Sequence, residues 1–412
     1  MSVIKPFRAI RPADNAKASQ IAALPYDVYN REEAKAEVEK NPMSFLKVDR
    51  AETQFPDDVS TYDPRVYSRA KELLDGMRED GSYITDEKRN YYIYELTMDG
   101  RSQAGLVACA SIDDYLTGVI KKHENTRAEK EQDRIDHVNT CSAQTGPIFL
   151  AYRGAKDIDV VMDRVMTGEP VYDFTSEDGV GHRVWVIDDP EDIGDIGLAF
   201  MRIAEIYIAD GHHRCASAVK VGQLRRKEAG DYDGTEEFNF FLCVLFPDHQ
   251  LKILDYNRVV KDLNGMSAEE FLGKVKEVMD VDEIDASKAS PTRRHTFGMF
   301  LDGKWYSLSA RREQITGDPV KGLDVSILQD YILEPLLGIE DPKTDDRIDF
   351  VGGIRGMDEL ERRCSVDCRV AFSMYPTSIS ELFEVADAGM LMPPKSTWFE
   401  PKLRSGLFIH EI

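Results

Sequence analysis

The sequence contains no run of about 18 apolar residues, the length that a membrane-spanning helix requires. Its first residues, MSVIKPFRAIRP, carry positive charges without a following apolar stretch, so we expect no secretory signal. Internal repeats and low-complexity tracts are also missing. These absences argue against membrane and repeat architectures and favour a cytoplasmic globular protein.

Cysteine is scarce, and none of the six cysteines stands in a Cys-x-x-Cys pair. Cys364 and Cys368 are one helical turn apart, but no second pair with metal-like spacing accompanies them. We therefore expect neither a disulfide framework nor a zinc site, but reduced thiols in a cytoplasmic protein. The other cysteines are scattered through the chain: Cys109, Cys141, Cys215 and Cys243.

An excess of positive charge is absent too, because 52 lysines and arginines face 75 aspartates and glutamates, a formal net charge of −23. Such a field repels polyanions, whereas nucleic-acid binding normally needs a basic face. We expect no nucleic-acid partner and no membrane partner. A small charged substrate with a divalent cation suits this composition better. The sequence leaves the oligomeric state open.

The chain, at 412 residues, is too long for one typical compact core. We expect an N-terminal α+β part over residues 1–105, a catalytic core over 106–265 and a C-terminal α+β part over 266–412. Within the core, an apolar strand at 203–209 precedes a helix over 214–230. This order of strands and helices predicts an α/β (α+β) fold.

Two stretches alternate apolar and polar residues on both sides of a turn. Residues 90–111 turn at Asp99-Gly100, and residues 238–260 turn at Pro247-Asp248. Alternation interrupted by such turn residues predicts β-hairpins.

The segment IYIADGHHRCASA, residues 206–218, places a carboxylate, two imidazoles and a guanidinium where a strand becomes a helix. Free N–H groups and the helix dipole make such a helix start an anion site, and Gly211 permits close approach. Arg214 can hold phosphate through two N–H groups, His212 and His213 can donate to oxyanions, and Asp210 can hold a divalent metal. The alternative is a polar turn whose aspartate caps the helix.

The segment KKHENTRAEKEQDR, residues 121–134, predicts a long polar helix that begins near Glu124. Charge runs on helices usually form solvated surfaces. The alternative interpretation is therefore that Arg127 and Glu131 lie on a solvated helix face. Glu124 differs because it follows an extended piece at 118–122, where a carboxylate can face a cleft.

The segment MPPKSTWFEPK, residues 392–402, offers a cation and two hydroxyls on Lys395, Ser396 and Thr397. This set suits phosphate, although the glycine-rich lead of a Walker motif is missing. The alternative is a rigid surface loop stiffened by Pro393 and Pro394.

Taken in order, these three stretches resemble the ParB-like free serine kinases, which phosphorylate free L-serine to O-phospho-L-serine. The resemblance implies a core related to ParB and sulfiredoxin, with further mixed α/β parts before and after it. The chain also resembles a large bacterial and archaeal family long described as a domain of unknown function. PYDVYN near the start, HENTRAEKEQDR and MPPKSTWFEPK carry that second likeness.

The resemblance implies roles for the residues of all three stretches. Glu124 would be the general base on the serine hydroxyl, and Asp210 would lie near the metal and the substrate. The chain departs from the small kinases in a longer segment between these two residues and in about a hundred initial residues without a counterpart. The implied catalytic set also includes His213, which shares the phosphate cradle; the phosphate and donor set is Gly211, His212, Arg214, Lys395, Ser396 and Thr397; the substrate set is His123 and Arg127.

These residues predict Mg²⁺-dependent phosphoryl transfer to a small hydroxyl compound, and the resemblance implies that this acceptor is free L-serine. ATP, ADP and pyrophosphate all remain possible donors. The serine carboxylate needs a cationic or N–H partner, for which Arg8, Arg11 and Arg127 are candidates. The alternatives are a phosphoserine phosphatase or reverse transfer, a ParB-like nucleotide-binding regulator, and an oxidoreductase with a metal on His212, His213 and Cys215.

Overall fold

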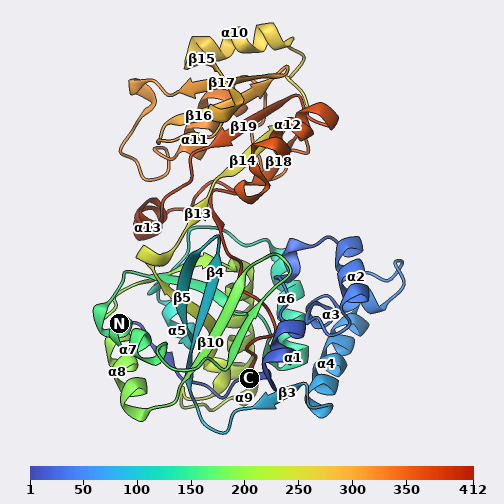
Figure 1. The fold of residues 1–412 in the computed structure, drawn as a ribbon, viewed down its shortest axis with the longest axis vertical. Helices are drawn as coiled ribbons and strands as arrows, with labels where there is room; N and C mark the ends of the chain where they lie inside the picture. Colours follow the sequence, from blue (N-terminus) through green and yellow to red (C-terminus); the bar gives the residue numbers. More distant parts are fainter. The chain divides into compact units, whose positions relative to one another are not determined.

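The computed structural model describes residues 1–412 and divides the chain into two compact units (Figure 1). The first unit consists of Met1–Leu251 together with Pro401–Ile412, and the second of Lys252–Glu400. This division differs from the three parts predicted from the sequence. The expected boundary between residues 105 and 106 falls inside strand β5 (Arg101–Ser111), which is continuous.

A nine-stranded sheet forms the centre of the first unit, in the order β6-β11-β8-β12-β5-β4-β10-β9, with β1 paired to β5. Most pairs are antiparallel, but β6 with β11 and β8 with β12 are parallel. The mixture confirms the predicted α/β class. The bounds of the strands are β1 Ile4–Lys5, β4 Tyr91–Met98, β6 Ile120–Lys121, β8 Ile148–Tyr152, β9 Tyr172–Thr175, β10 Gly181–Ile187, β11 Ile206–Asp210 and β12 Phe240–Pro247.

The first predicted hairpin is confirmed and the second is wrong. Strands β4 and β5 pair through a turn at Asp99 and Gly100, both of which have positive φ, as a twisted two-residue hairpin requires. After β12, by contrast, the chain leaves the sheet: β14 (Tyr256–Val260) pairs with β18 and β19 in the second unit. Alternation predicts strands, but it does not say which strands pair.

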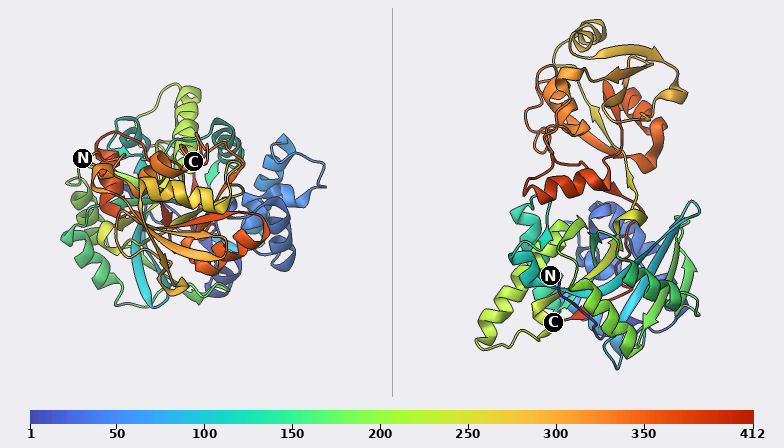
Figure 2. Two further views of the ribbon diagram at one scale, coloured as in Figure 1. Left: turned by 90° about the horizontal axis from the view of Figure 1, so that it is seen from above. Right: turned by 90° about the vertical axis from the view of Figure 1, so that its left-hand side faces the viewer.

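Helices in the first unit form a second core beside the sheet. In Figures 1 and 2 the N-terminal helices α1–α4, in blue, gather on one side of this unit's sheet. Their buried residues pack with Cys141 at the end of α6. Helix α6 also packs against α9 and α4. The bounds are α1 Asn15–Ile21, α2 Arg31–Lys40, α3 Leu46–Asp49, α4 Pro64–Glu79, α5 Ile112–Leu116, α6 Ala128–Cys141, α7 Lys156–Val165, α8 Pro190–Phe200 and α9 His212–Ala229.

The second unit is an antiparallel sheet with its own helices. The strand order is β15-β17-β16-β19-β14-β18. An apolar core around Val259, Trp305 and Leu360 lies between the sheet and α12 (Gly356–Val366). The remaining bounds are α10 Ala268–Val278, α11 Asp324–Leu328, α13 Ile379–Asp387, β13 Ile253–Leu254, β15 Asp280–Ile284, β16 Thr296–Leu301, β17 Lys304–Ser309, β18 Ile348–Gly352, β19 Val370–Met374 and β20 Trp398–Phe399.

The structure bears on the expected absence of membrane-spanning helices and on the state of the cysteines. No helix combines the length and the apolar character that crossing a bilayer would take. All six cysteines are free thiols, and only Cys364 among them is not fully buried.

Candidate functional site

Two adjacent parallel strands bring the first two sequence stretches together. Strand β6 pairs with β11 in parallel, with Ile120 opposite Ile206 and Lys121 opposite Tyr207. Parallel neighbours end at the same edge of a sheet, which is where ligands bind in open α/β sheets. The segments 122–127 and 210–214 are therefore neighbours, although more than eighty residues separate them.

Gly211 makes the sharp change from β11 to α9 possible. Its φ is 90°, in the left-handed region that favours glycine. A Cβ at this position would lie 3.1 Å from Nε and Nη2 of Arg214. The Gly211 N–H donates to Oδ1 of Asp210 at 2.8 Å, and no side chain caps the helix. The alternative of a capping aspartate is thus wrong, and the first N–H groups of α9 are left for a ligand.

Asp210 carries a fixed negative charge. Its Oδ2 accepts a hydrogen bond from Nζ of Lys402 at 2.9 Å. Burial alone would raise the pKa of Asp210, but Lys402 and Arg214 outweigh it and hold the pKa well below its usual range. Lys402 is the last residue of MPPKSTWFEPK, and sequence reasoning singled out Lys395 there instead.

His123 and His212 form an edge-to-face pair of buried imidazoles, with ring centroids 4.6 Å apart. Burial lowers the pKa of His123 to about 4, and burial and His123 lower the pKa of His212 as well. Both rings are therefore neutral near pH 7. Nδ1 of His123 and Nε2 of His212 have no hydrogen-bond partner within the chain, so each can serve a ligand.

Glu124 stands beside this pair in the loop between β6 and α6. Its Oε2 lies 4.0 Å from Nδ1 of His212, and its side chain is 44% exposed. The polar helix expected from about residue 124 begins only at Ala128. Glu124 is consequently a loop carboxylate within reach of solvent, next to a neutral imidazole.

His213 links the two segments rather than facing outward from the helix start. The backbone N–H of Arg127 donates to Nε2 of His213 at 3.0 Å. Burial, with Lys130 nearby, lowers the pKa of His213, which keeps this acceptor nitrogen unprotonated. The bond ties the start of α9 to the residue that precedes α6.

Part of the polar run of α6 is buried rather than solvated, although Glu129, Lys130 and Gln132 are exposed. Glu131 is buried, accepts from Thr126 at 2.6 Å and pairs with Lys220. Asp133 and Arg134 are also buried, with Arg134 Nε donating to Asp133 Oδ2 at 2.9 Å. The charged run in this part of the sequence therefore supplies a buried polar network.

Two of the three arginines considered for a substrate carboxylate are committed elsewhere. Arg11 donates its Nε–H to both carboxylate oxygens of Asp86, at 3.0 and 2.9 Å. Arg8 donates to the carbonyl oxygen of the same residue at 3.0 Å. Arg214 and Arg134, which the sequence did not suggest for this role, line one pocket of the first unit.

The Lys-Ser-Thr turn belongs to the second unit. Lys395 has a φ of 58°, unusual for a side chain of this size, and its carbonyl accepts from Nη2 of Arg258 at 3.0 Å. The Ser396 hydroxyl donates to the Pro393 carbonyl at 2.6 Å. Arg258, on β14, is buried, makes its other hydrogen bond to a carbonyl of Tyr256, and was not predicted.

No group of three histidine, cysteine, aspartate or glutamate side chains is arranged to hold a metal ion. The oxidoreductase alternative therefore lacks its ligand set, and Cys215 is fully buried. Magnesium needs fewer protein ligands, because it keeps several waters and uses one or two carboxylates together with substrate phosphates. Asp210 fits that role as an ionised carboxylate, in exchange for its contact with Lys402.

The chain belongs to the family described as "Protein of unknown function (DUF1015)", which matches residues 4–326. The expected membership of a family of unknown function is confirmed over that range, which does not include residues 392–402. No curated protein matches the chain.

Several solved structures are similar to the chain at low identity. One is a free serine kinase mutant in complex with AMP, with 14% identity and a TM-score of 0.35 over 73% of this chain and 91% of that one. A conserved hypothetical protein from Pyrococcus furiosus has 15% identity and a TM-score of 0.35, over 73% and 94%. SbnI with a C-terminal truncation, from Staphylococcus aureus, has 10% identity and a TM-score of 0.37, over 72% and 85%. TM-scores of this size carry no argument about activity.

Proposed function

We propose that the protein is an Mg²⁺-dependent phosphotransferase that converts free L-serine to O-phospho-L-serine. One observation carries the proposal: Glu124, open to solvent, follows β6, and Asp210, held ionised, ends the adjacent parallel strand β11, both near two neutral imidazoles. Phosphoryl transfer needs positioning, charge neutralisation and one carboxylate that takes the hydroxyl proton. The order of the sequence stretches, which resembles free serine kinases, agrees with this chemistry.

Glu124 is the proton acceptor of the proposed reaction. The serine hydroxyl oxygen forms a bond to the transferred phosphorus, the bond from that phosphorus to the bridging oxygen of the donor breaks, and the hydroxyl proton passes to Glu124. The donor leaves as an anion with one phosphoryl group fewer. Nδ1 of His212 lies 4.0 Å from the carboxylate, and because this imidazole is neutral it adds no positive charge that would oppose proton uptake by Glu124.

The start of α9 is the proposed phosphate cradle. Its free N–H groups, which follow Gly211, can donate hydrogen bonds to the oxygens of a transferred phosphoryl group, and Arg214 in the same turn can donate to them too. Asp210 would hold Mg²⁺, which would supply positive charge to neutralise the negative charge of the transition state. Lys402 keeps Asp210 ionised before the cation arrives.

His123, His213 and Arg127 have supporting roles in this proposal. The buried His123 offers its unpaired Nδ1 to the substrate. His213 is a positioning residue, because its bond to the Arg127 N–H fixes the end of the loop that carries Glu124.

Lys395, Ser396 and Thr397, in the second unit, are proposed to bind phosphate. Two features of the second unit support this. Lys395 adopts a strained backbone conformation, of the kind that concentrates at binding sites. The buried Arg258 donates only to carbonyl oxygens, so its charge has no carboxylate partner.

The test incubates the full chain with Mg²⁺, L-serine and, separately, ATP, ADP or pyrophosphate, and follows O-phosphoserine by mass spectrometry. Product with one of the donors supports the proposal and identifies that donor. Absence of product with all three, together with release of phosphate from O-phosphoserine, would overturn it in favour of hydrolysis. Absence of both phosphoserine formation and phosphoserine hydrolysis would exclude serine as the acceptor and overturn the proposal.

A further inference from the structure

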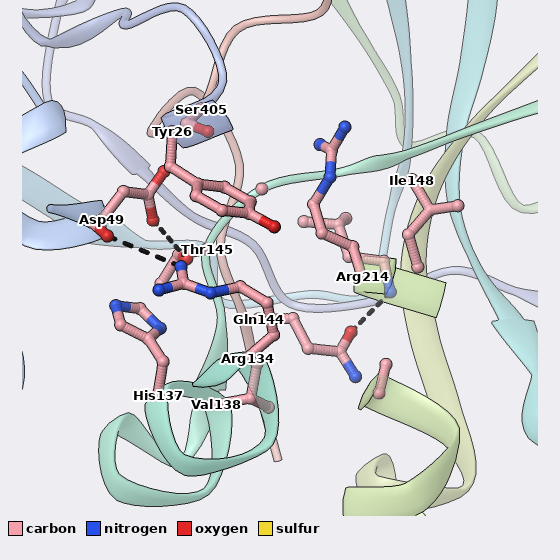
Figure 3. Close-up of a pocket in the computed structure, with 13 residues that line it drawn as sticks. Tyr26, Asp49, Arg134, His137, Val138, Gln144, Thr145, Ile148, Arg214 and Ser405 are labelled. Atoms are coloured by element: carbon pink, nitrogen blue, oxygen red, sulfur yellow. Dashed lines mark hydrogen bonds between the residues drawn. The ribbon is translucent and has the colours of Figure 1, made fainter. Parts of the chain in front are cut away.

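A small polar pocket in the first unit adjoins the start of α9 (Figure 3). The half-buried residues of its lining, Tyr26, Gly146 and Arg214, mark its open side, and the rest are buried. The space open to the centre of a water molecule is about 30 Å³. That is room for about two water positions, which suits the polar head of a small molecule rather than a nucleotide.

The charged groups around this pocket balance each other. Arg134 and Arg214 are its cations, while Asp49 lines it and Asp133 lies against Arg134. Arg134 and Asp49 are both more than nine-tenths buried. His137 lines the pocket as well, and burial and Arg134 lower the pKa of this imidazole, so it adds no charge near pH 7.

Several hydrogen-bonding groups of the lining have no hydrogen-bond partner within the chain. Arg134 donates Nε–H to Asp133 and has Nη1 3.5 Å from the Asp49 carbonyl oxygen, which leaves further guanidinium N–H groups without a partner. Oδ1 of Asp49 accepts from the Thr145 hydroxyl at 2.8 Å, and Oδ2 has no partner in the chain. The side-chain hydroxyl of Tyr26 is also without one, and its ring lies 4.2 Å from the guanidinium carbon of Arg134.

We infer that this pocket binds the zwitterionic head of a small α-amino acid. The guanidinium of Arg134 and the Tyr26 hydroxyl bind the carboxylate, and Asp49 binds the ammonium. A group with one positive and one negative charge matches a lining of Arg134, Arg214 and Asp49, with Asp133 paired to Arg134 behind it. A bare phosphate would face Asp49 and Asp133, and a bare amine would face Arg134 and Arg214.

The inference rests on the proposed function, because it assigns where the acceptor is recognised. Arg214 belongs both to the pocket and to the turn that begins with Asp210. The side chain of an amino acid held by its head leaves the pocket on the side where Arg214 lies. This assignment also gives the substrate carboxylate a partner other than Arg8 and Arg11, which are bound to Asp86.

Binding to the wild-type full chain tests the inference without any chemistry. Isothermal titration would use L-alanine, which has the zwitterionic head but no hydroxyl to phosphorylate, beside L-serine, ethanolamine and glycolate. We expect L-alanine and L-serine to bind with affinities within about tenfold of each other. Ethanolamine lacks the carboxylate and glycolate lacks the ammonium, so each should bind at least about tenfold more weakly than L-serine, as loss of one charge-assisted bond implies.

Two variants locate the binding. Tyr26→Phe removes only a hydroxyl without a partner in the chain, so it should fold normally and weaken L-alanine binding by about three- to tenfold. Asp49→Asn keeps the acceptor for Thr145 but removes the charge, and should weaken binding by at least about tenfold. Tyr232→Phe and Asp113→Asn make the same changes at positions outside the pocket and should leave the affinity unchanged.

The outcomes separate this inference from the proposed function. L-alanine binding that the pocket variants weaken, without phosphoserine formation, would support the pocket and overturn the proposed reaction. Phosphoserine formation without any L-alanine binding or competition would overturn the pocket and leave the reaction standing. Binding of L-alanine that neither pocket variant weakens would overturn the pocket as well.

Discussion

The ammonium of Lys402 lies 2.9 Å from Oδ2 of Asp210, a residue 192 positions earlier in the chain. The contact brings the C-terminal segment of the first unit to the end of β11. It fixes the charge of the carboxylate at the centre of the proposed site and leaves the neighbouring Glu124 as the carboxylate that can take up a proton.

Replacing Lys402 by methionine should destabilise the protein in a pH-dependent way. The wild-type pKa of Asp210 is depressed, so its contribution is complete above the unfolded pKa of about 4 and is lost as pH falls through the folded value. Without Lys402, burial raises this pKa. We expect a loss of about 1–2 kcal/mol in the free energy of unfolding at pH 7, measured by urea denaturation. The difference should shrink below pH 4; a constant difference down to pH 2 would contradict this account.

The same Lys402→Met variant tests the assignment of magnesium to Asp210. An ammonium and a divalent cation compete for the same carboxylate oxygen, so removing the ammonium should strengthen Mg²⁺ binding. We expect the Mg²⁺ concentration for half-maximal binding, measured by calorimetry with the donor present, to fall several-fold. An unchanged or raised concentration would indicate that Mg²⁺ does not use Asp210.

Substituting alanine for Gly211 should disturb the site more than the same change at Gly234. Both glycines have φ close to 90°, so alanine carries a similar backbone penalty of about 1 kcal/mol at each. Only at position 211 does the new Cβ meet a neighbour, the Arg214 guanidinium, while Gly234 has open space. We expect Gly211→Ala to lose at least about tenfold in kcat/KM for phosphoserine formation and Gly234→Ala to keep it. Equal activities would contradict the proposed role of the turn.

The buried His123 should make stability fall with acid. Its folded pKa of about 4 lies below the unfolded value of about 6.5, so the folded state favours the neutral ring. Its contribution is complete above pH 6.5 and is lost as pH falls to 4, up to about 3 kcal/mol. His123→Gln should flatten the dependence of the unfolding free energy on pH in this window. The same change at the exposed His249 should leave the slope as it is; an identical effect of both would contradict the assignment.

Lys395 should act on the phosphoryl donor and not on serine. If the turn binds donor phosphates, Lys395→Met raises the KM for the donor by about five- to fiftyfold and leaves the KM for L-serine unchanged, since an ion pair to phosphate is lost. Steady-state kinetics with each substrate varied separately measures the split. Lys304→Met, at a lysine of the same unit paired with Glu283, is the matched control. A rise in the KM for serine alone would assign the turn to the acceptor.

Local sequence signals predicted the backbone around Asp210 well. The apolar run, the glycine and the small-residue helix around Asp210 carry their structure in local preferences, and the structure has β11, a left-handed Gly211 and α9 at these places. The hairpin of β4 and β5 was equally readable, because Asp-Gly turns favour positive φ.

Contacts between residues far apart in the chain could not be predicted from the sequence. Nothing local to Lys402 indicates that it pairs with Asp210, nor does the composition around Arg134 distinguish a buried network from a solvated helix face. The strand after β12 was assigned to a hairpin because alternation is the same whichever strand lies opposite. The pairing of β6 with β11, which brings the two segments of the candidate site together, is likewise a contact between distant residues that local patterns do not predict.

Glu124 is the group proposed to accept the serine proton, and its replacement tests the mechanism most directly. Initial rates of O-phosphoserine formation would be compared for the wild type, Glu124→Gln and Glu129→Gln, the last being the same change at an exposed glutamate in the first turn of α6. We expect Glu124→Gln to lose at least about a hundredfold in kcat while Glu129→Gln stays within about twofold of the wild type. A Glu124→Gln enzyme as fast as the wild type would contradict the proposed mechanism.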